Sequence, residues 1–412
     1  MIPIIFGAPG RYKSGLQIPA VPALELTLTE DSAAGRVRWI IASHHLTGFV
    51  VNSLTRPTTA GRIYNLGGSG LRSAIMGITT SGTANPMMLH NATDHKGNEV
   101  AFIENNITSN YGPFSAGDVE SGGEFWFGFT DQQVGGLANP YRDGLLDGCS
   151  DVVRYILERY SGQRVDKSRM EAEAADLNNL KIDCVINAAT TATKWIESLA
   201  NVYPLRMVQG PDGVYVKRRR YTADRSQAVA ALATKGQSGN IGVSRRSGLV
   251  LVEDEIYNSI RVEYAPRKMG QDYQASVTVG ASEQVQTQLT AGTVGLVPKN
   301  IQGASRVAEG SQASYGLREK VVSAPTCFDE STAAAIGVAM AERYAMPRYA
   351  VTYTGDRSLE TLNPGDVVTI ADPDLTDNRR LAIVDDVVIG SRQPTVVLEL
   401  VSDPIAWTVS TG

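Results

Sequence analysis

The stretch Leu362-Asn363-Pro364-Gly365-Asp366-Val367-Val368-Thr369-Ile370 shows most directly how this chain is built. Residues 363–366 have the composition of a tight turn, because proline favours the second turn position. The β-branched run 367–370 that follows is typical of a strand. Similar runs lie at 350–353, 382–389 and 395–400. The C-terminal region therefore predicts a small β structure of four strands.

A helix is predicted immediately before these strands, over residues 329–344. Asp329 can cap its first turn, and Pro347 prevents its continuation. One side of the helix is apolar or small, with Ala333, Ile336, Met340, Ala341 and Tyr344. The spacing of these side chains is that of a helix packed on a core. Residues 315–412 are accordingly expected to form a helix plus a small β barrel domain.

Residues 141–220 have a mixed pattern. Ser150 and Asp151 offer a cap for a helix that Gly162 would end. A second helix is expected over about 167–180, and a third from Thr191 until Pro204 stops it. A strand at 182–186 and a hairpin at 206–217 complete the pattern. This region predicts an α/β domain with helices against a small sheet.

The rest of the chain reads mostly as strands. Residues 1–140 contain period-two runs, such as 24–29, and no helical stripe, which predicts an N-terminal β barrel-like domain. Residues 221–314 predict a second β domain. It contains a short helix at 228–233, a strand at 255–264 and a long loop or arm at 280–313. The expected fold class is mainly β with α/β insertions.

Composition excludes several classes of protein. The 412 residues carry a net charge of −5, which argues against a duplex nucleic-acid binder. Cys149, Cys184 and Cys327 are odd in number and far apart, which gives no support to a zinc site or a disulfide framework. The N-terminus lacks the pattern of a signal peptide, and no apolar run reaches the ~18–20 residues that span a bilayer. We expect folding in a reducing cytoplasm.

No coherent catalytic, cofactor or metal site is predicted. His44 and His45 would point to opposite faces of a strand, and Asp94-His95 reads as a polar loop. Residues 67–70, Gly-Gly-Ser-Gly, lack the lysine and spacing of a phosphate loop and read as a turn. His90 belongs to no ligand pattern. The expected set of catalytic, cofactor-binding and metal-binding residues is therefore none.

The charged clusters also have plain interpretations. The acidic groups are Asp372 with Asp374, Asp385 with Asp386, and the run 253–255. Adjacent carboxylates do not supply the separated pair that a glycosidase needs, and turn chemistry explains 372–374 most simply. The run Lys217-Arg218-Arg219-Arg220 is interpreted as a solvated strand end, or as a surface facing an acidic partner or a nucleic-acid conduit.

Three stretches in a fixed order carry a family resemblance. The first is Ile2-Pro3-Ile4-Ile5-Phe6-Gly7, followed by strands at 39–44 and 48–53. The second runs from Ser150-Asp151-Val152-Val153 through Trp195-Ile196 to the hairpin ending in Val214-Tyr215-Val216-Lys217. The third is Tyr315-Gly316-Leu317-Arg318, the following helix, Pro364-Gly365-Asp366-Val367-Val368 and finally Ile383-Val384-Asp385-Asp386-Val387. Their order resembles the baseplate hub or tail-tip attachment proteins of long-tailed bacteriophages.

This resemblance implies a structural, non-enzymatic protein with no cofactor. It implies a ring, usually a homotrimer, that closes the distal tail tube through barrel-like tail-tube-type domains and small α/β hub domains. The implied partners are the distal tail protein ring, the tape-measure protein and tail fibres or a central spike, with DNA passing through the lumen without specific binding. The implied location is the distal end of the virion tail. The alternative is a receptor- or glycan-binding tail appendage. Phe125-Trp126-Phe127 is the best candidate for its aromatic platform, but alternating burial in a barrel explains this run more simply.

Overall fold

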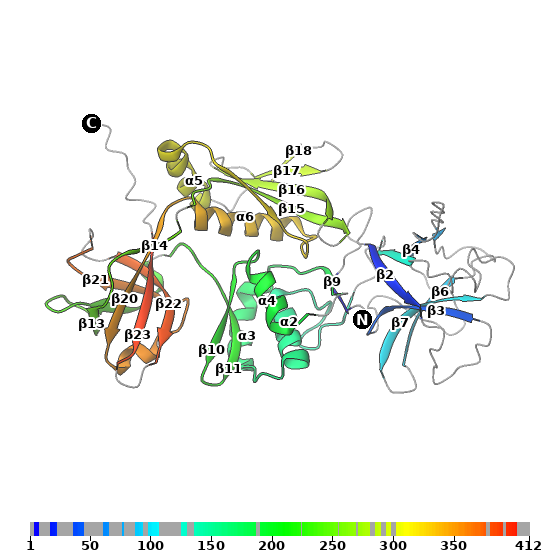
Figure 1. The fold of residues 1–412 in the computed structure, drawn as a ribbon, viewed down its shortest axis with the longest axis horizontal. Coiled ribbons are helices and arrows are strands. Elements are labelled where there is room, and N and C mark those ends of the chain that lie inside the picture. The colour runs from blue at the N-terminus through cyan, green and yellow to red at the C-terminus, as the bar shows by residue number, and fades with distance from the viewer. Residues whose placement is uncertain are drawn as a thin grey trace.

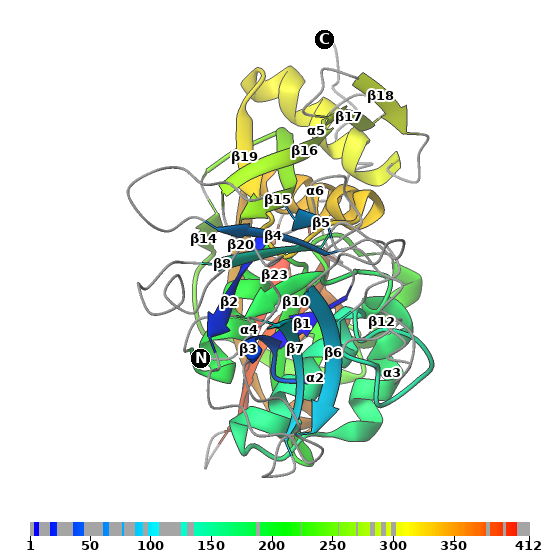
Figure 2. The ribbon, with the colours of Figure 1, turned by 90° about the vertical axis from the view of Figure 1, so that its right-hand side faces the viewer.

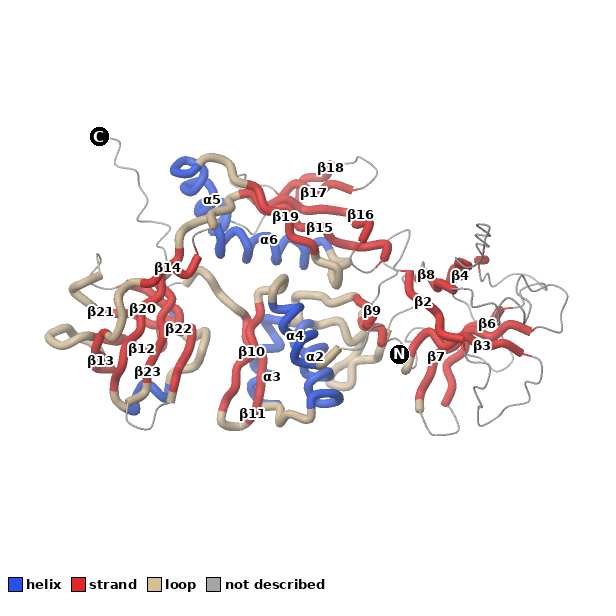
Figure 3. The backbone as a smooth tube through the Cα atoms, in the orientation of Figure 1, coloured by secondary structure: helices blue, strands red, loops and turns tan. Residues whose placement is uncertain are grey.

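The computed structural model describes most of the chain, in segments. The described residues are 4–7, 17–22, 36–44, 61–65, 76–77, 87–93, 98–106, 125–129, 136–186, 190–223, 225–253, 255–268, 271–280, 285–289, 294–297, 302–375, 380–389 and 393–401. Strands dominate, the α-helices lie in the middle of the molecule and in the region above it, and the barrel has only short helical turns among its described residues (Figure 3). The predicted mainly β class with α/β insertions is confirmed. Among the described residues, no helix has the length and apolar character needed to cross a bilayer.

The N-terminal part forms one seven-stranded sheet, at the right of Figure 1. The strand order is β5-β4-β8-β2-β3-β7-β6, and the described strands give no pairing between the two outer strands, β5 and β6. The strands are β2 (Gln17–Pro22), β3 (Arg36–Ala42), β4 (Gly61–Asn65), β5 (Met76–Gly77), β6 (Met87–Thr93), β7 (Glu99–Asn106) and β8 (Phe125–Phe129). Every described pairing within this sheet is antiparallel.

The middle of the molecule is the predicted α/β region. Its helical elements are α2 (Cys149–Ile156), a π-helical turn η1 (Leu157–Ser161), α3 (Lys167–Leu177) and α4 (Ala192–Ala200). Its strands are β1 (Ile4–Phe6) paired with β9 (Cys184–Ile186), and the hairpin of β10 (Leu205–Gly210) and β11 (Gly213–Arg218). Strand β1 thus ties the start of the chain to residues more than 170 positions later.

A five-stranded sheet lies above this region, seen from the side in Figure 2. Its strand order is β18-β17-β16-β15-β19, and two helices accompany it. The elements are β15 (Ser259–Lys268), β16 (Gln271–Val279), β17 (Val285–Leu289), β18 (Val294–Val297), α5 (Gln302–Tyr315), β19 (Glu319–Ser323) and α6 (Glu330–Tyr344). Its buried side chains and those of the α/β region form one continuous apolar core.

A closed barrel of six strands occupies the other end of the molecule. The ring of pairings runs β13-β12-β21-β22-β23-β20 and closes from β20 back to β13. The strands are β12 (Ala228–Ala233), β13 (Ile241–Arg245), β20 (Arg348–Gly355), β21 (Val367–Ala371), β22 (Arg380–Val388) and β23 (Thr395–Leu400). Short 3₁₀ turns η2 (Arg225–Gln227) and η3 (Arg357–Thr361) flank β12 and β20. The barrel has a separate apolar core of its own.

The turn predicted at residues 363–366 is present. The Asp366 N–H donates to the carbonyl of Asn363 at 3.0 Å, and Gly365 has a φ of 86°. A positive φ at the third position, after Pro364, defines a type II turn and requires glycine there. The turn delivers the chain into β21, whose residues are mostly buried in the barrel. The four predicted C-terminal strands are confirmed as β20 to β23.

The predicted helix starts are confirmed in two of three cases. Asp329 caps α6 by accepting from the Thr332 N–H at 2.8 Å, and Thr191 caps α4 by accepting from the Lys194 N–H. The predicted cap at Ser150 or Asp151 is wrong, because α2 begins at Cys149 after Gly148. Asp151 is instead buried and paired with Arg142.

Two predictions about residues 221–314 are wrong. The run 228–233 is the strand β12 and not a short helix, because its backbone pairs with β13 and β21 on its two sides. The run 280–313 is not an unstructured arm where it is described, since it contains β17, β18 and most of α5. The barrel also joins residues 228–253 to residues 348–401, so it crosses the expected boundary between 314 and 315.

Candidate assembly surfaces

His44, one of the histidines considered as a candidate ligand, has a structural role in the N-terminal region. His44 is only 4% exposed, and its Nε2 accepts from the Ile5 N–H at 2.9 Å. It thereby joins the end of β3 to β1, and through β1 to the central core. His45, Asp94, His95 and residues 67–70 lie outside the described residues, and His90 lies on β6. The part of the chain that the structure describes contains no group of three or more His, Cys, Asp or Glu side chains that could hold a metal ion.

The acidic pair Asp372 and Asp374 makes its contacts within the chain. Asp372 is buried and accepts from the hydroxyl of Tyr353 at 2.7 Å and from the Asp374 N–H at 3.1 Å. The second contact is the turn chemistry expected for 372–374. Burial and the Asp372 hydrogen bond raise the pKa of Tyr353, so it remains a hydrogen-bond donor. Arg245 lies 3.9 Å from Asp372 and 3.5 Å from Asp374, so its single positive charge offsets part of their negative charge.

The basic run 217–220 is not simply a solvated strand end. Lys217 Nζ lies 2.8 Å from Asp366 in the turn before β21, and Arg218 lies 2.7 Å from Asp176 on α3. Arg219 lies over the ring of Tyr221 at 5.4 Å. These contacts neutralise part of the run inside the chain.

A second basic side chain joins the hairpin to the barrel. The Arg206 guanidinium, on β10, donates to the backbone carbonyl of Asp385 on β22 and lies 3.4 Å from the Asp385 carboxylate. Burial lowers the pKa of Arg206, and the Asp385 charge opposes this shift. Sequence reasoning missed this role, because nothing in the sequence places residues 206 and 385 side by side.

The three cysteines are buried and not paired in disulfides, at positions 149, 184 and 327. Burial raises the pKa of each thiol, which keeps the thiols neutral and unreactive. Their place in the central core explains the choice of a small apolar side chain there. They offer no nucleophile to a substrate.

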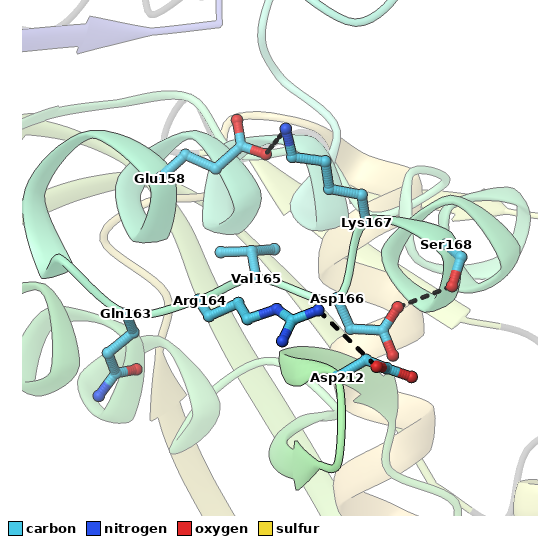
Figure 4. Close-up of a pocket in the computed structure, with 8 residues that line it drawn as sticks. All are labelled: Glu158, Gln163, Arg164, Val165, Asp166, Lys167, Ser168 and Asp212. Carbon is cyan, nitrogen blue, oxygen red and sulfur yellow. Dashed lines mark hydrogen bonds and ion pairs between the residues drawn. The ribbon is translucent and has the colours of Figure 1, made fainter.

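One shallow groove lies between the end of η1, the start of α3 and the tip of the β10–β11 hairpin (Figure 4). Asp166 caps α3 there, accepting from the Arg169 N–H at 3.1 Å and from the Ser168 hydroxyl at 2.7 Å. The Ser168 hydrogen bond is the main cause that lowers the pKa of Asp166. Long ion pairs, Arg164–Asp212 at 3.8 Å and Lys167–Glu158 at 3.9 Å, cross the groove (Figure 4). Of its three carboxylates, Asp166 caps α3, and Glu158 and Asp212 are paired with basic side chains, so each has a partner within the chain.

Exposed apolar side chains form three surfaces that are better candidates for contact with other chains. The first, here called the rim surface, lies on strand β14 (Val250–Glu253) and the residue before it, with Tyr349 of β20 beside them. The second is the β19 edge, with Leu317 and Val321. The third is the end of β22, with Val388 and Ile389.

The rim surface is the most unusual of the three. Four consecutive side chains are exposed, at 44% for Leu249, 55% for Val250, 47% for Leu251 and 53% for Val252. Successive strand residues point to opposite faces, so both faces of β14 carry exposed apolar groups. One side of β14 pairs with β20, and the described strands supply no partner for the other side. Such an edge is a template for another strand.

One family model matches part of the chain. Residues 298–385 match the family model of putative phage tail proteins named Phage-tail_3. This segment includes α5, β19, α6 and the barrel strands β20 and β21. No match was found among curated proteins.

Comparison with solved structures gives a likeness of fold. A chain of the virion of a native gene transfer agent particle aligns over 100% of this chain and 86% of its own, with a TM-score of 0.50 and 12% identity. The prophage MuSo2 43 kDa tail protein from Shewanella oneidensis aligns over 98% of this chain and 99% of its own, with a TM-score of 0.35 and 11% identity. A tail protein from Neisseria meningitidis MC58 aligns over 98% of each chain, with a TM-score of 0.33 and 11% identity.

Proposed function

We propose that this chain, a structural protein of the phage tail type by its family match, is the baseplate hub at the distal end of the tail. In this role it forms a ring, a homotrimer, that closes the tail tube. The ring contacts the distal tail protein ring, the tape-measure protein and fibres or a central spike. The protein acts by holding its neighbours in place, without catalysis, and DNA passes through its lumen without specific binding.

The observation that carries the proposal is the match of residues 298–385 to putative phage tail proteins. The fold of the whole chain adds support, since a virion chain shares it at a TM-score of 0.50. The order of the three sequence stretches supports the hub position within the tail. A homotrimer would supply three copies of the closed barrel and of the N-terminal sheet, which suits a ring around a tube.

The exposed apolar groups support assembly. Leu317 is 66% exposed beside the β19 edge, and Ile389 is 69% exposed at the end of β22. These sites lie on separate sheets, so they can meet different neighbours. Burial between subunits would remove both from water and stabilise the ring.

The test is an image of the purified chain together with its mass in solution. A threefold ring of three copies supports the hub. In a virion, antibody or gold labelling of this chain should decorate the distal end of the tail. A monodisperse monomer at micromolar concentration that does not associate with tail components contradicts the hub. Specific binding to a glycan array by that monomer would favour the receptor-binding appendage.

A further inference from the structure

The rim surface continues a longer line of residues along β20. Strands β13 and β14 pair, one after the other, with the side of β20 that faces away from β23. Between them, the Arg246 N–H donates to the carbonyl of Thr352 on β20 at 2.8 Å, so the line has little interruption. The far side of β13 pairs with β12, whereas the far side of β14 has no partner among the described strands. The exposed edge therefore begins where β13 ends.

This line carries opposite charges at its two ends. It reads Arg246-Ser247-Gly248-Leu249-Val250-Leu251-Val252-Glu253, with Glu255 two positions later. Arg246 is exposed, and its guanidinium makes a long hydrogen bond of 3.4 Å to the Thr395 hydroxyl. The Glu255 side chain is 63% exposed, with its carboxylate 3.9 Å from Lys320 Nζ. Both charges are open to water, one on each side of an apolar stretch.

The free edge sets requirements on the strand that can add to it. Apolar side chains at four consecutive positions, 249–252, point to both faces of the sheet, so the added strand must be apolar on both faces. A second copy of β14 meets this requirement. Laid antiparallel, it also brings the basic end of one copy against the acidic end of the other, which stabilises the cross-strand contact. A parallel copy would place like charges side by side.

We propose that β14 pairs with β14 of a second copy of this chain, antiparallel and about a two-fold axis. An axis perpendicular to the sheet keeps every side chain on its own face, so one residue must stand opposite itself. With Val250 in that position, Leu249 stands opposite Leu251 of the second copy. Arg246 then stands opposite the acidic end of the second copy, between its two glutamates.

The pairing closes the edge instead of extending it. Each β14 uses its free backbone groups on the other copy, so the contact stops at two chains and removes a template for further strands. The two apolar stretches cover one another in the same step. This inference goes beyond the proposed function, because the contact needs no ring. If rings form as well, the same edges join chains of two rings.

Cross-linking of the full chain tests the two-fold contact directly. Val250→Cys carries one accessible thiol per chain, because the three native cysteines are buried. Directly opposite Cβ atoms in an antiparallel pair lie about 5 Å apart, within reach of a short bismaleimide. The matched control is Val229→Cys, at a 62% exposed apolar position on β12 of the same barrel.

The expected result is a covalent dimer through Val250→Cys, on the order of tenfold more abundant than through Val229→Cys. Equal yields from the two variants would overturn the proposal. The native mass separates the pairing from the proposed function. Two copies with the link support the pairing and contradict the ring, and six copies with the link support both. Three copies without the link leave the hub standing but overturn the pairing, and a monomer overturns both.

Charge reversal tests the polarity of the contact. Arg246→Glu makes both ends of the line acidic, and Glu253→Arg combined with Glu255→Arg makes both ends basic. Each variant alone should dimerise on the order of tenfold more weakly in sedimentation equilibrium, because like charges then meet. An equal mixture of the two should recover the affinity of the unchanged chain to within about threefold, since each acidic end meets a basic one.

The mixture separates a contact between chains from damage within one chain. A loss of barrel stability would persist in the mixture, and circular dichroism of each variant checks for it. If both variants remain folded and their mixture fails to recover dimers, the antiparallel pairing is wrong. Equal dimerisation of the unchanged chain, each variant and the mixture would overturn it as well.

Discussion

A buried ion pair at the base of the barrel offers the sharpest test of its energetics. Arg348, the first residue of β20, and Glu399 of β23 have side chains that are 5% and 7% exposed. Arg348 Nη2 lies 3.0 Å from Glu399 Oε1 but lacks the direction of a hydrogen bond, so their attraction is mainly electrostatic. The Arg348 guanidinium also lies over the ring of Tyr221 at 4.7 Å. Burial lowers the pKa of Arg348, yet a guanidinium stays protonated in proteins.

Replacing Glu399 with Gln leaves this buried cation without its counter-charge. Removing one partner of a buried pair costs about 3–5 kcal/mol in the free energy of unfolding. A loss of about 3 kcal/mol lowers the folding equilibrium constant more than a hundredfold. The double variant Arg348→Met with Glu399→Leu should recover most of this loss, because an apolar pair of similar volume has no charge to compensate.

The assay is urea unfolding followed by circular dichroism, with hydrogen exchange of β20 and β23 to locate the change in the barrel. The matched control is Glu263→Gln, which breaks the exposed Arg261–Glu263 pair of 3.2 Å and should cost less than about 1 kcal/mol. The reasoning is refuted if Glu399→Gln costs no more than this control. It is also refuted if the double variant is as unstable as the single one.

Three further outcomes are expected. A Cβ on Gly337 of α6 would lie 2.7 Å from Val279 Cγ2, so Gly337→Leu should destabilise the sheet beneath the helix by about 1–3 kcal/mol in urea unfolding, and Gly337→Ala should cost less. Hydrogen bonds hold the pKa of Asp166 below its unfolded value. Its contribution to the free energy of unfolding is therefore present above about pH 4 and is lost as the pH falls through the folded pKa. In acid titrations followed by circular dichroism, Asp166→Asn should remove that part of the pH dependence of stability. Ile389→Asp should reduce the fraction of assembled rings in mass photometry while the circular dichroism spectrum stays unchanged.

Local signals in the sequence were sufficient for much of the fold. Asp329 and Thr191 cap helices where their position before an apolar stripe predicted it, because capping depends on residues three positions apart. The turn at 363–366 is equally local. The strand β12 shows where such reasoning fails. An alanine-rich run favours a helix by propensity, but pairing with β21 and β13 decides its conformation, and those partners lie elsewhere in the sequence.

The candidate surfaces depend on contacts that local sequence patterns do not reveal. The exposure of the apolar run 249–252 follows from the topology, in which β14 is an outer strand next to β20. The basic run 217–220 can be recognised in the sequence. Its partners cannot, because Asp366 lies in the turn before β21 and Asp176 lies on α3. Long-range pairing of this kind leaves no mark in the spacing of residues.

These contacts also explain how the two cores of the molecule are joined. The central core and the barrel core are separate apolar clusters. Between them, Lys217 pairs with Asp366 and Arg206 contacts Asp385. These links between the hairpin and the barrel are made by charged groups and not by apolar side chains shared between the two cores. Charged contacts of this kind are typical of interfaces across which domains can shift. Each core is therefore enclosed by its own elements, and these charged pairs contribute to the contact between the barrel and the α/β region.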